Sequence, residues 1–549
     1  MNKYIKNIVP AVALLAMGLS SCVGDLDVEP IDPNLITTPA IEQAYNKCFA
    51  NLAMAGNSGP DGDTDIDGLD GGTSAFIRQL FNANELTTDE AICNWTNDEG
   101  IPQFNFNTYG ASHPMLRGFY YRLTTGYTYC NNFLADYGGQ NKQMDAEIRF
   151  LRALEYYFLM DCFGNVGFTE TVSAENAPRY TRKQMYDWLE QELLTIEPDL
   201  ADAKAKTSAD EGYGRPDKAA AWVLLSRLYL NAEVYTGTAQ WQKAADYAKK
   251  VIDSPYKLYT GEKKNGWTAY QQLFLADNGE NGASVEAVFP IVFDGKTTAA
   301  YGGTNYFTGG CYDANVVVDP QGTKGANLTA NANWAGIRSR KSLVDKFFPN
   351  NNAPHVEARY MPEEAGDDRA IFDGKGGEKD DEKRTISQET AEDLGVFVKG
   401  FAVAKYANFC ASGANPKDTK FPDIDFFLFR AAEAYLTYAE ATARQNGGNT
   451  TAEGTAYINQ IRARAHTTTR TGSYTLRDIM DEWSREFYFE GRRRTDLIRF
   501  NCFGGDNNYN WPWKGGVAEG KNFSANRNIF AIPTTDLLMN TNLIQNTGY

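Results

Sequence analysis

The sequence of 549 residues predicts a mostly α-helical protein, in which tetratricopeptide-like helix pairs form a scaffold that carries a large, irregular, loop-rich insertion. Apolar residues recur at helical spacing in the first and last parts of the chain, and two segments have the residue pattern of a helix pair. The intervening segment is rich in Gly, Asn and Asp and has only short apolar runs. We therefore expect a helical scaffold at 40–254, an irregular region with the ligand site at 255–420 and further helical repeats at 421–549.

The first residues, 1–22, are typical of a lipoprotein signal peptide. Lys3 and Lys6 precede an apolar run, which ends in LSSC and resembles a bacterial lipobox. We expect a lipid anchor on Cys22 and a flexible, acidic tether over 23–39. Elsewhere the sequence has no run of about 20 uninterrupted apolar residues, which a membrane-spanning helix needs.

Amphipathic helices are predicted over much of the first part of the chain. Four stretches have apolar residues at helical spacing: 39–55, 114–136, 144–163 and 181–200. Between them, residues 76–107 alternate turn formers with aromatic residues, so we expect a loop-rich, site-forming region there. The stretch 59–72 has five Asp in fourteen residues but lacks the spacing and terminal Glu of an EF-hand, so we interpret it as a solvated loop.

Two segments have the pattern of tetratricopeptide helix pairs. The first is 215–253, and four of its residues fit the W-x2-L-G-x2-Y start of such a pair with Ser in place of Gly: Trp222, Leu225, Ser226 and Tyr229. The second is formed by 430–444 and 452–465. We expect the aromatic residues of these apolar stripes to lie in the core.

Composition excludes several functional classes. The formal net charge is −17, which argues against nucleic acid as a partner, because phosphate binding needs a basic surface. A neutral ligand such as a sugar suits this charge. Apart from Cys22, the seven cysteines form no CxxC motif, which favours neither a disulfide framework nor a zinc site. Only His113, His355 and His466 are available for a histidine-dependent enzyme, and none lies in a known motif.

The segment 478–500 combines an apolar helical stripe with a high density of charge. Gly491 lies between two helical halves and indicates a bend. Charged residues four apart can pair along a helix: Glu490 with Arg494, and Arg492 with Asp496. So many charges beside so many aromatic residues predict a partly buried, mutually paired charge network, which belongs to the scaffold rather than to a ligand site.

Within this segment, the run REFYFEGRRRTDLIRF (485–500) resembles the C-terminal signature of the SusD/RagB family, the glycan-capturing surface lipoproteins of gut Bacteroidetes. Three further stretches are similar to family blocks and follow in family order: 146–168, 423–444 and 532–549. The resemblance implies a cell-surface protein, anchored in the outer membrane and facing the exterior, that captures starch or malto-oligosaccharides. It also implies delivery to a SusC-like TonB-dependent transporter, with no enzymatic activity and no required cofactor.

A sugar site needs aromatic rings against the C–H faces of the sugar, and hydrogen-bonding groups at its hydroxyl rim. The resemblance to the starch-binding member of the family places such a site on five residues: Arg78, Trp95, Asp98, Tyr301 and Trp334. The three aromatic residues would be platforms, and Arg78 and Asp98 would hold hydroxyls. Two departures bear on specificity: Cys93 replaces an additional Trp, and Asp98 replaces an amide.

The family also suggests a structural calcium ion at Asp423 and Asp425, near the oxygen-rich stretch 277–281. From the residues alone, an Asp before a helix is more often an N-cap.

Three alternative functions stay open. The same fold could take a different oligosaccharide or a peptide. A surface glycosidase would need two suitably spaced carboxylates across the scissile bond. A pure interaction protein would complete the transporter without binding glycan itself.

Overall fold

The computed structural model describes residues 40–323 and 333–549, so Cys22, the signal peptide and the tether lie outside the described residues. Residues 45–549 form one compact unit, and residues 40–44, described separately, begin helix α2 (Ile41–Ala53). The larger unit is built mainly from helices, with short strands, which confirms the predicted fold class. Within the described residues, no helix is both long enough and apolar enough to cross a membrane.

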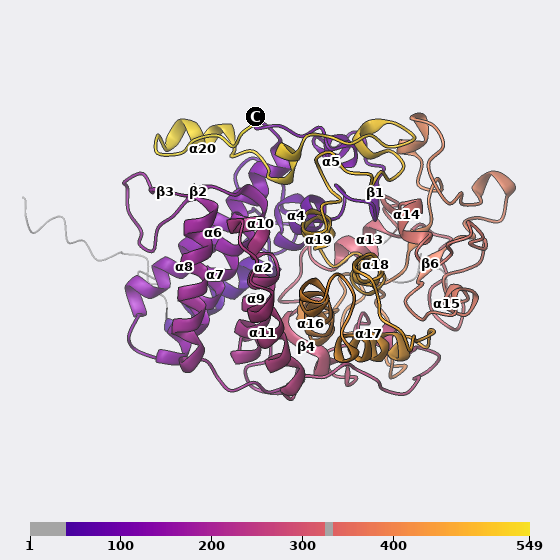
Figure 1. Cartoon of the computed structure of the whole chain (residues 1–549), viewed down its shortest axis with the longest axis horizontal. Coiled ribbons are helices and arrows are strands. Elements are labelled where there is room, and N and C mark those ends of the chain that lie inside the picture. The colour runs from indigo at the N-terminus through magenta and orange to yellow at the C-terminus, as the bar shows by residue number, and fades with distance from the viewer. Residues whose placement is uncertain (1–39, 324–332) are drawn as a thin grey trace, which may run out of the picture. The chain divides into compact units, whose positions relative to one another are not determined.

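Long helices in the first part of the unit pack side by side (Figure 1). They are α6 (Pro114–Tyr137), α7 (Lys142–Phe163), α8 (Arg182–Ile196), α9 (Lys218–Leu230) and α11 (Trp241–Asp253). The starts of α7, α8 and α9 follow from capping side chains, since Asn141, Thr181 and Asp217 each accept hydrogen bonds from backbone N–H groups of the first turn. The helices predicted at 39–55, 114–136, 144–163 and 181–200 are therefore confirmed, with boundaries shifted by a few residues.

The two predicted helix pairs are also present. Helix α9 packs against α11, and α16 (Ala431–Gln445) packs against α17 (Ala452–Arg464). Helix α11 also contacts α16, so the two pairs form one continuous layer although residues 254–430 separate them in sequence. Ala244 and Ala248 are fully buried in α11, where small side chains let neighbouring helices approach closely.

Short strands connect the irregular region to the helical parts. A four-stranded antiparallel sheet has the order β1 (Ala91–Cys93), β5 (Ile337–Ser339), β7 (Ala402–Val403) and β6 (Phe372–Asp373). Strand β4 (Ala287–Ile291) pairs with β8 (Phe426–Arg430), directly before α16, and β2 (Val166–Gly167) pairs with β3 (Arg179–Tyr180). These pairings bring segments that are far apart in sequence into contact.

Most remaining helices are short. They are α3 (Gly71–Ser74), α4 (Phe76–Asn84), α5 (Ile101–Phe106), α10 (Ala232–Thr236), α12 (Ala269–Gln272), α13 (Asn305–Gly310), α14 (Lys341–Val344), α15 (Met361–Ala365), α18 (Leu476–Phe487), α19 (Arg493–Arg499) and α20 (Thr534–Met539). The stretch 76–107 is thus more regular than predicted, because it contains α4, β1 and α5. Residues Phe76 and Leu80 are buried on α4, whose helical spacing the turn signals further along the stretch obscured.

The charged C-terminal segment bends as predicted. Gly491 has φ +75° between α18 and α19, a left-handed conformation that glycine adopts without strain. Arg492 pairs with Asp496 at 3.1 Å, as expected. The predicted pairing of Glu490 with Arg494 is wrong: Glu490 binds Lys405 at 2.6 Å and Arg430 at 2.8 Å. The chain has already left the helix at Glu490, so the four-residue spacing no longer places it beside Arg494.

Candidate functional site

Helix α4 positions Arg78 at the edge of the candidate site. Its backbone N–H donates to the carbonyl of Gly302 at 3.0 Å, which joins α4 to the segment that carries Tyr301. Its guanidinium donates to the carbonyl of Gly72 at 3.3 Å and contacts the carboxylate of Asp98 at 3.5 Å. Arg78 is largely buried, whereas 46% of the Asp98 side chain is exposed, so the carboxylate is the accessible member of the pair.

The β1–β5 ladder brings the two tryptophans together. Cys93 pairs with Ile337, and the ladder continues with the N–H of Asn94 donating to the carbonyl of Gly336 at 2.9 Å. This register carries Trp95 past the end of β1 to a position next to Trp334. Their ring centroids lie 6.3 Å apart at 51°, and the indole N–H of Trp95 donates to the Trp334 carbonyl at 3.3 Å.

Tyr301 extends this pair into a row of three rings, which we call the aromatic arc: Trp95, Trp334 and Tyr301. The centroids of Tyr301 and Trp334 are 6.1 Å apart at 47°. All three rings are half-buried, so each keeps accessible surface. The guanidinium of Arg78 lies 5.5 Å from the Trp95 ring, within the range of a cation–π contact. The structure therefore brings all five residues expected at the site together.

Two glycines leave room for the indole rings of Trp334 and Trp95. A Cβ added to Gly309 would lie 2.6 Å from an atom of the Trp334 ring, and one added to Gly336 would lie 2.1 Å from the Trp95 ring. Such distances are shorter than real Cβ contacts, so only glycine lets each ring lie against the backbone here. The N–H of Trp334 also donates to the carbonyl of Gly309 at 2.8 Å. The platforms are therefore fixed by backbone packing.

Three supporting residues were not predicted from the sequence. Tyr306 is fully buried, with its ring centroid 6.0 Å from that of Trp95 and 5.0 Å from the Arg78 guanidinium carbon. Phe421 packs against Tyr301 with centroids 5.0 Å apart. Asp61 accepts a hydrogen bond of 2.7 Å from the Tyr301 hydroxyl. The only signal in the sequence was the cluster of aspartates around Asp61.

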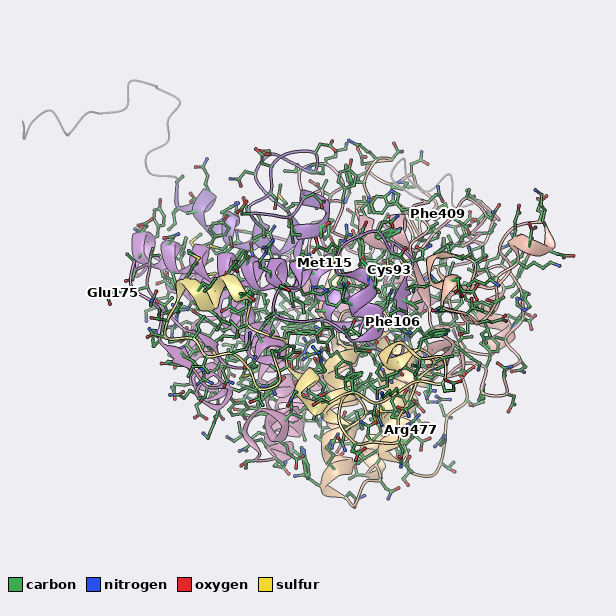
Figure 2. The ribbon with its side chains drawn as sticks, turned by 90° about the horizontal axis from the view of Figure 1, so that it is seen from above. Cys93, Phe106, Met115, Glu175, Phe409 and Arg477 are labelled. Carbon is green, nitrogen blue, oxygen red and sulfur yellow. The ribbon has the colours of Figure 1, made fainter. Side chains whose placement is uncertain are left out.

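Cys93 is not part of the aromatic arc. Its side chain, labelled in Figure 2, is fully buried in β1, and burial raises the pKa of its thiol to about 12. The side chain of Asn105 binds both the N–H and the carbonyl of Cys93, at 3.0 and 2.7 Å. In this chain the position therefore supports β1 and presents no surface to a ligand.

The predicted calcium ligands have protein partners for most of their oxygens. Asp425 accepts from the N–H of Phe293 at 2.9 Å and from the hydroxyl of Tyr213 at 2.7 Å. Asp423 lines a pocket of about 540 Å³ together with Asp277, and one of its carboxylate oxygens has no partner. Calcium takes six to eight oxygen ligands, yet the described residues contain no group of three or more His, Cys, Asp or Glu able to hold a metal. The calcium site stays a prediction.

Sequence comparison places the chain among known proteins. The sequence model of the SusD family matches residues 285–549, and a model described as "Starch-binding associating with outer membrane" matches residues 132–230. The starch-binding protein SusD of Bacteroides thetaiotaomicron is 37% identical, over the full length of both chains. The chain belongs to the SusD family.

Solved structures of SusD-like proteins share the fold. Surface glycan-binding protein A from Bacteroides uniformis has a TM-score of 0.64 at 20% identity, covering 92% of this chain and 98% of its own. Surface glycan-binding protein A from Bacteroides thetaiotaomicron, in complex with laminarihexaose, has a TM-score of 0.62 at 19% identity, with 92% and 98% covered. At these identities the likeness concerns the SusD-family fold.

Proposed function

We propose that this protein captures α-glucan, either starch or malto-oligosaccharides, on the aromatic arc. The convergence of Arg78, Trp95 and Trp334 carries the proposal. Residues from α4, the end of β1 and the approach to β5 meet within contact distance, although the two tryptophans are 239 positions apart in sequence. Full-length identity of 37% to a starch-binding relative supports the choice of α-glucan.

The geometry suits a neutral polysaccharide. Half-buried rings offer flat apolar surfaces to the C–H faces of sugars, and the Arg78–Asp98 pair offers donors and an acceptor to hydroxyls. The centroid steps of 6.3 and 6.1 Å are accompanied by inter-ring tilts of 51° and 47°. Successive platforms therefore face different directions, as a curved chain of sugars requires.

A second candidate is the same site with a different oligosaccharide as its ligand. Two structural relatives are described as binding laminarin or as a complex with laminarihexaose. In this chain Cys93 contributes no platform and Asp98 supplies a carboxylate where the starch-binding pattern has an amide, so its set of contacts is its own. A peptide ligand is a less favoured alternative, because the arc consists of apolar rings flanked by charged groups that are already paired.

We further propose binding without catalysis. Glycoside hydrolysis needs a carboxylic acid with a raised pKa beside a second carboxylate. At the arc, Asp98 is paired with Arg78, and hydrogen bonds from Tyr301 and Lys420 lower the pKa of Asp61. An acid with a lowered pKa is poorly suited to protonate a leaving group.

The proposed cellular setting is the outer face of the outer membrane. A lipid on Cys22 would anchor the protein, and the glycan would pass to a SusC-like TonB-dependent transporter that this protein covers as a lid. Support comes from the family, whose second matching model describes association with the outer membrane.

Native affinity electrophoresis tests the ligand. The protein from Val23 onward is run in gels with amylopectin, dextran, laminarin or no glycan, beside Trp334→Ala. We expect retardation by amylopectin alone and a loss of retardation in the variant, because losing one platform removes on the order of 1 kcal/mol, about fivefold in affinity. Trp241→Ala, at another half-buried tryptophan in α11, is the matched control and should run like wild type.

Retardation by laminarin alone would replace α-glucan with the second candidate while keeping the site. Retardation in no gel would contradict glycan capture by the isolated protein. Equal retardation of wild type and Trp334→Ala would place the glycan elsewhere on the molecule.

A further inference from the structure

The aromatic arc is bracketed by two ion pairs of the same kind. At the Trp95 end, Arg78 and Asp98 are 3.5 Å apart. At the Tyr301 end, the ammonium of Lys420 is 3.0 Å from the carboxylate of Asp61. Only the first pair belongs to the site expected from the sequence, and the second comes from two loops to which no role has been assigned.

The second pair is built onto the last platform. One carboxylate oxygen of Asp61 accepts from the Tyr301 hydroxyl at 2.7 Å, and the other accepts from Lys420. The Lys420 ammonium lies 5.3 Å from the ring centroid of Phe421, which itself packs against Tyr301. The acidic loop 59–72 and the segment before β8 therefore meet at the Tyr301 ring.

Both side chains remain accessible to a ligand. The exposed fraction is 65% for the side chain of Asp61 and 51% for that of Lys420. A carboxylate oxygen has more than one acceptor direction and an ammonium has three donors, so each group can bind a hydroxyl while keeping its present partner. Because the pair is exposed, a neutral sugar can reach it without desolvating a buried charge.

We propose that Asp61 and Lys420 form a second hydrogen-bonding edge of the glycan site, which binds hydroxyls of a sugar residue beyond Tyr301. The inference rests on the proposed function and deepens it. The site would then hold a segment of glycan that runs from Arg78 and Asp98, over the three rings, to Asp61 and Lys420. A longer oligosaccharide gains this contact, and a short one bound at the Trp95 end does not.

Isothermal titration calorimetry with oligosaccharides of increasing length tests the edge. Maltotriose and maltoheptaose are titrated into wild type and the double variant Asp61→Ala/Lys420→Ala, with laminaritriose and laminarihexaose as a second series. In the series that wild type binds, we expect the double variant to lose about fivefold to tenfold in affinity for the long ligand. Affinity for the trisaccharide should change less than twofold.

Two further variants separate the edge from indirect effects. Lys183→Ala/Asp187→Ala removes another exposed Lys–Asp pair, 2.7 Å apart on α8, and should bind like wild type at every length. Tyr301→Phe removes the hydroxyl that Asp61 accepts from but keeps the ring, and should keep the preference for the long ligand.

Different results overturn different claims. If the double variant keeps the full gain from ligand length, the second edge is wrong and the arc stands. If Tyr301→Phe loses as much as the double variant, Asp61 acts only by holding Tyr301, which also overturns the edge. If wild type binds neither series, both the edge and the proposed function are wrong.

Discussion

At the residue scale, the site depends on two positions where only glycine fits. Gly309 and Gly336 have no Cβ, and this allows the indoles of Trp334 and Trp95 to lie against the backbone. A ring held by the backbone loses little conformational freedom on binding, because its orientation is set in advance. The two glycines therefore help to fix the rings on which we propose that the glycan binds.

A substitution at Gly336 tests whether glycine is needed beside the Trp95 ring. In Gly336→Ala the new Cβ would meet the Trp95 ring at 2.1 Å, so the ring must move out of the arc. We expect affinity for the glycan to fall about fivefold to tenfold, as for loss of the platform itself. Calorimetry measures the affinity, and circular dichroism checks that the fold is kept. Gly472→Ala, at a position with nothing within 4 Å, is the control. Unchanged affinity in Gly336→Ala would show that glycine is not required at this position.

The five site residues were expected from family resemblance and not from local pattern. No periodicity connects Trp95 to Trp334, since their contact depends on a ladder between two three-residue strands. The position of Asp61 beside the arc could not be predicted for a related reason. Its stretch has the composition of a solvated loop, and its hydrogen bond to Tyr301 is seen only in the structure. Roles that depend on long-range contacts are not visible in a single sequence.

At the element scale, buried charges join strand β8 to helix α18 and to the segment before β4. Arg430, at the end of β8, contacts the carboxylates of Glu286 at 2.8 Å, Glu486 at 2.6 Å and Glu490 at 2.8 Å, and all of these groups are buried. The sequence predicted such a network from the density of charge beside aromatic residues. It could not predict the partners, because Glu286 and Arg430 are brought together by the β4–β8 pairing.

Removing the central cation should be severe. Arg430→Met removes one cationic partner from each of three buried carboxylates, which costs about 3–5 kcal/mol of the free energy of unfolding. Urea denaturation followed by circular dichroism measures the loss. Arg477→Met is a matched control on α18, because the side chain of Arg477 is 58% exposed. It should cost less than about 1 kcal/mol. Similar values for both variants would contradict a structural role for the network.

The buried carboxyl group of Glu155 should make the stability of the protein depend on pH. Burial raises the pKa of Glu155, on α7, from its ordinary value of 4.5 to about 8, although Asn51 donates a hydrogen bond to it. The unfolded chain loses this proton near pH 4.5 and the folded chain keeps it to about pH 8. Above pH 4.5 the unfolded state therefore binds fewer protons than the folded state, and this carboxyl lowers stability as pH rises to about 8.

Glu155→Gln removes this titration. Between pH 5 and pH 8, we expect the free energy of unfolding of the variant to rise relative to that of wild type. The gain should reach a few kcal/mol, the order of magnitude that corresponds to the raised pKa of Glu155. Urea unfolding at pH 5, 7 and 8.5 gives the difference. Glu175→Gln, on the exposed loop before β3, should follow the wild-type curve (Figure 2). A constant difference between Glu155→Gln and wild type at all three pH values would show that Glu155 does not titrate in this range.

At the scale of the whole molecule, helix pairs and irregular segments have separate tasks. The helices of the two pairs, α9, α11, α16 and α17, could be predicted because their segments have the residue pattern of tetratricopeptide helix pairs. Strands of two or three residues, such as β1, β5 and β7, have no periodic signal, so the sheet that assembles the arc could not. The helical layer forms the scaffold, and short strands and loops position the rings.

A crystal structure of the protein with maltoheptaose would test glycan binding on the aromatic arc most directly, because it would show where the sugar lies. We expect glucose rings stacked on Trp95, Trp334 and Tyr301, with hydroxyls bound by Arg78 and Asp98 at one end. Glucan bound at another surface, with the arc empty, would contradict it.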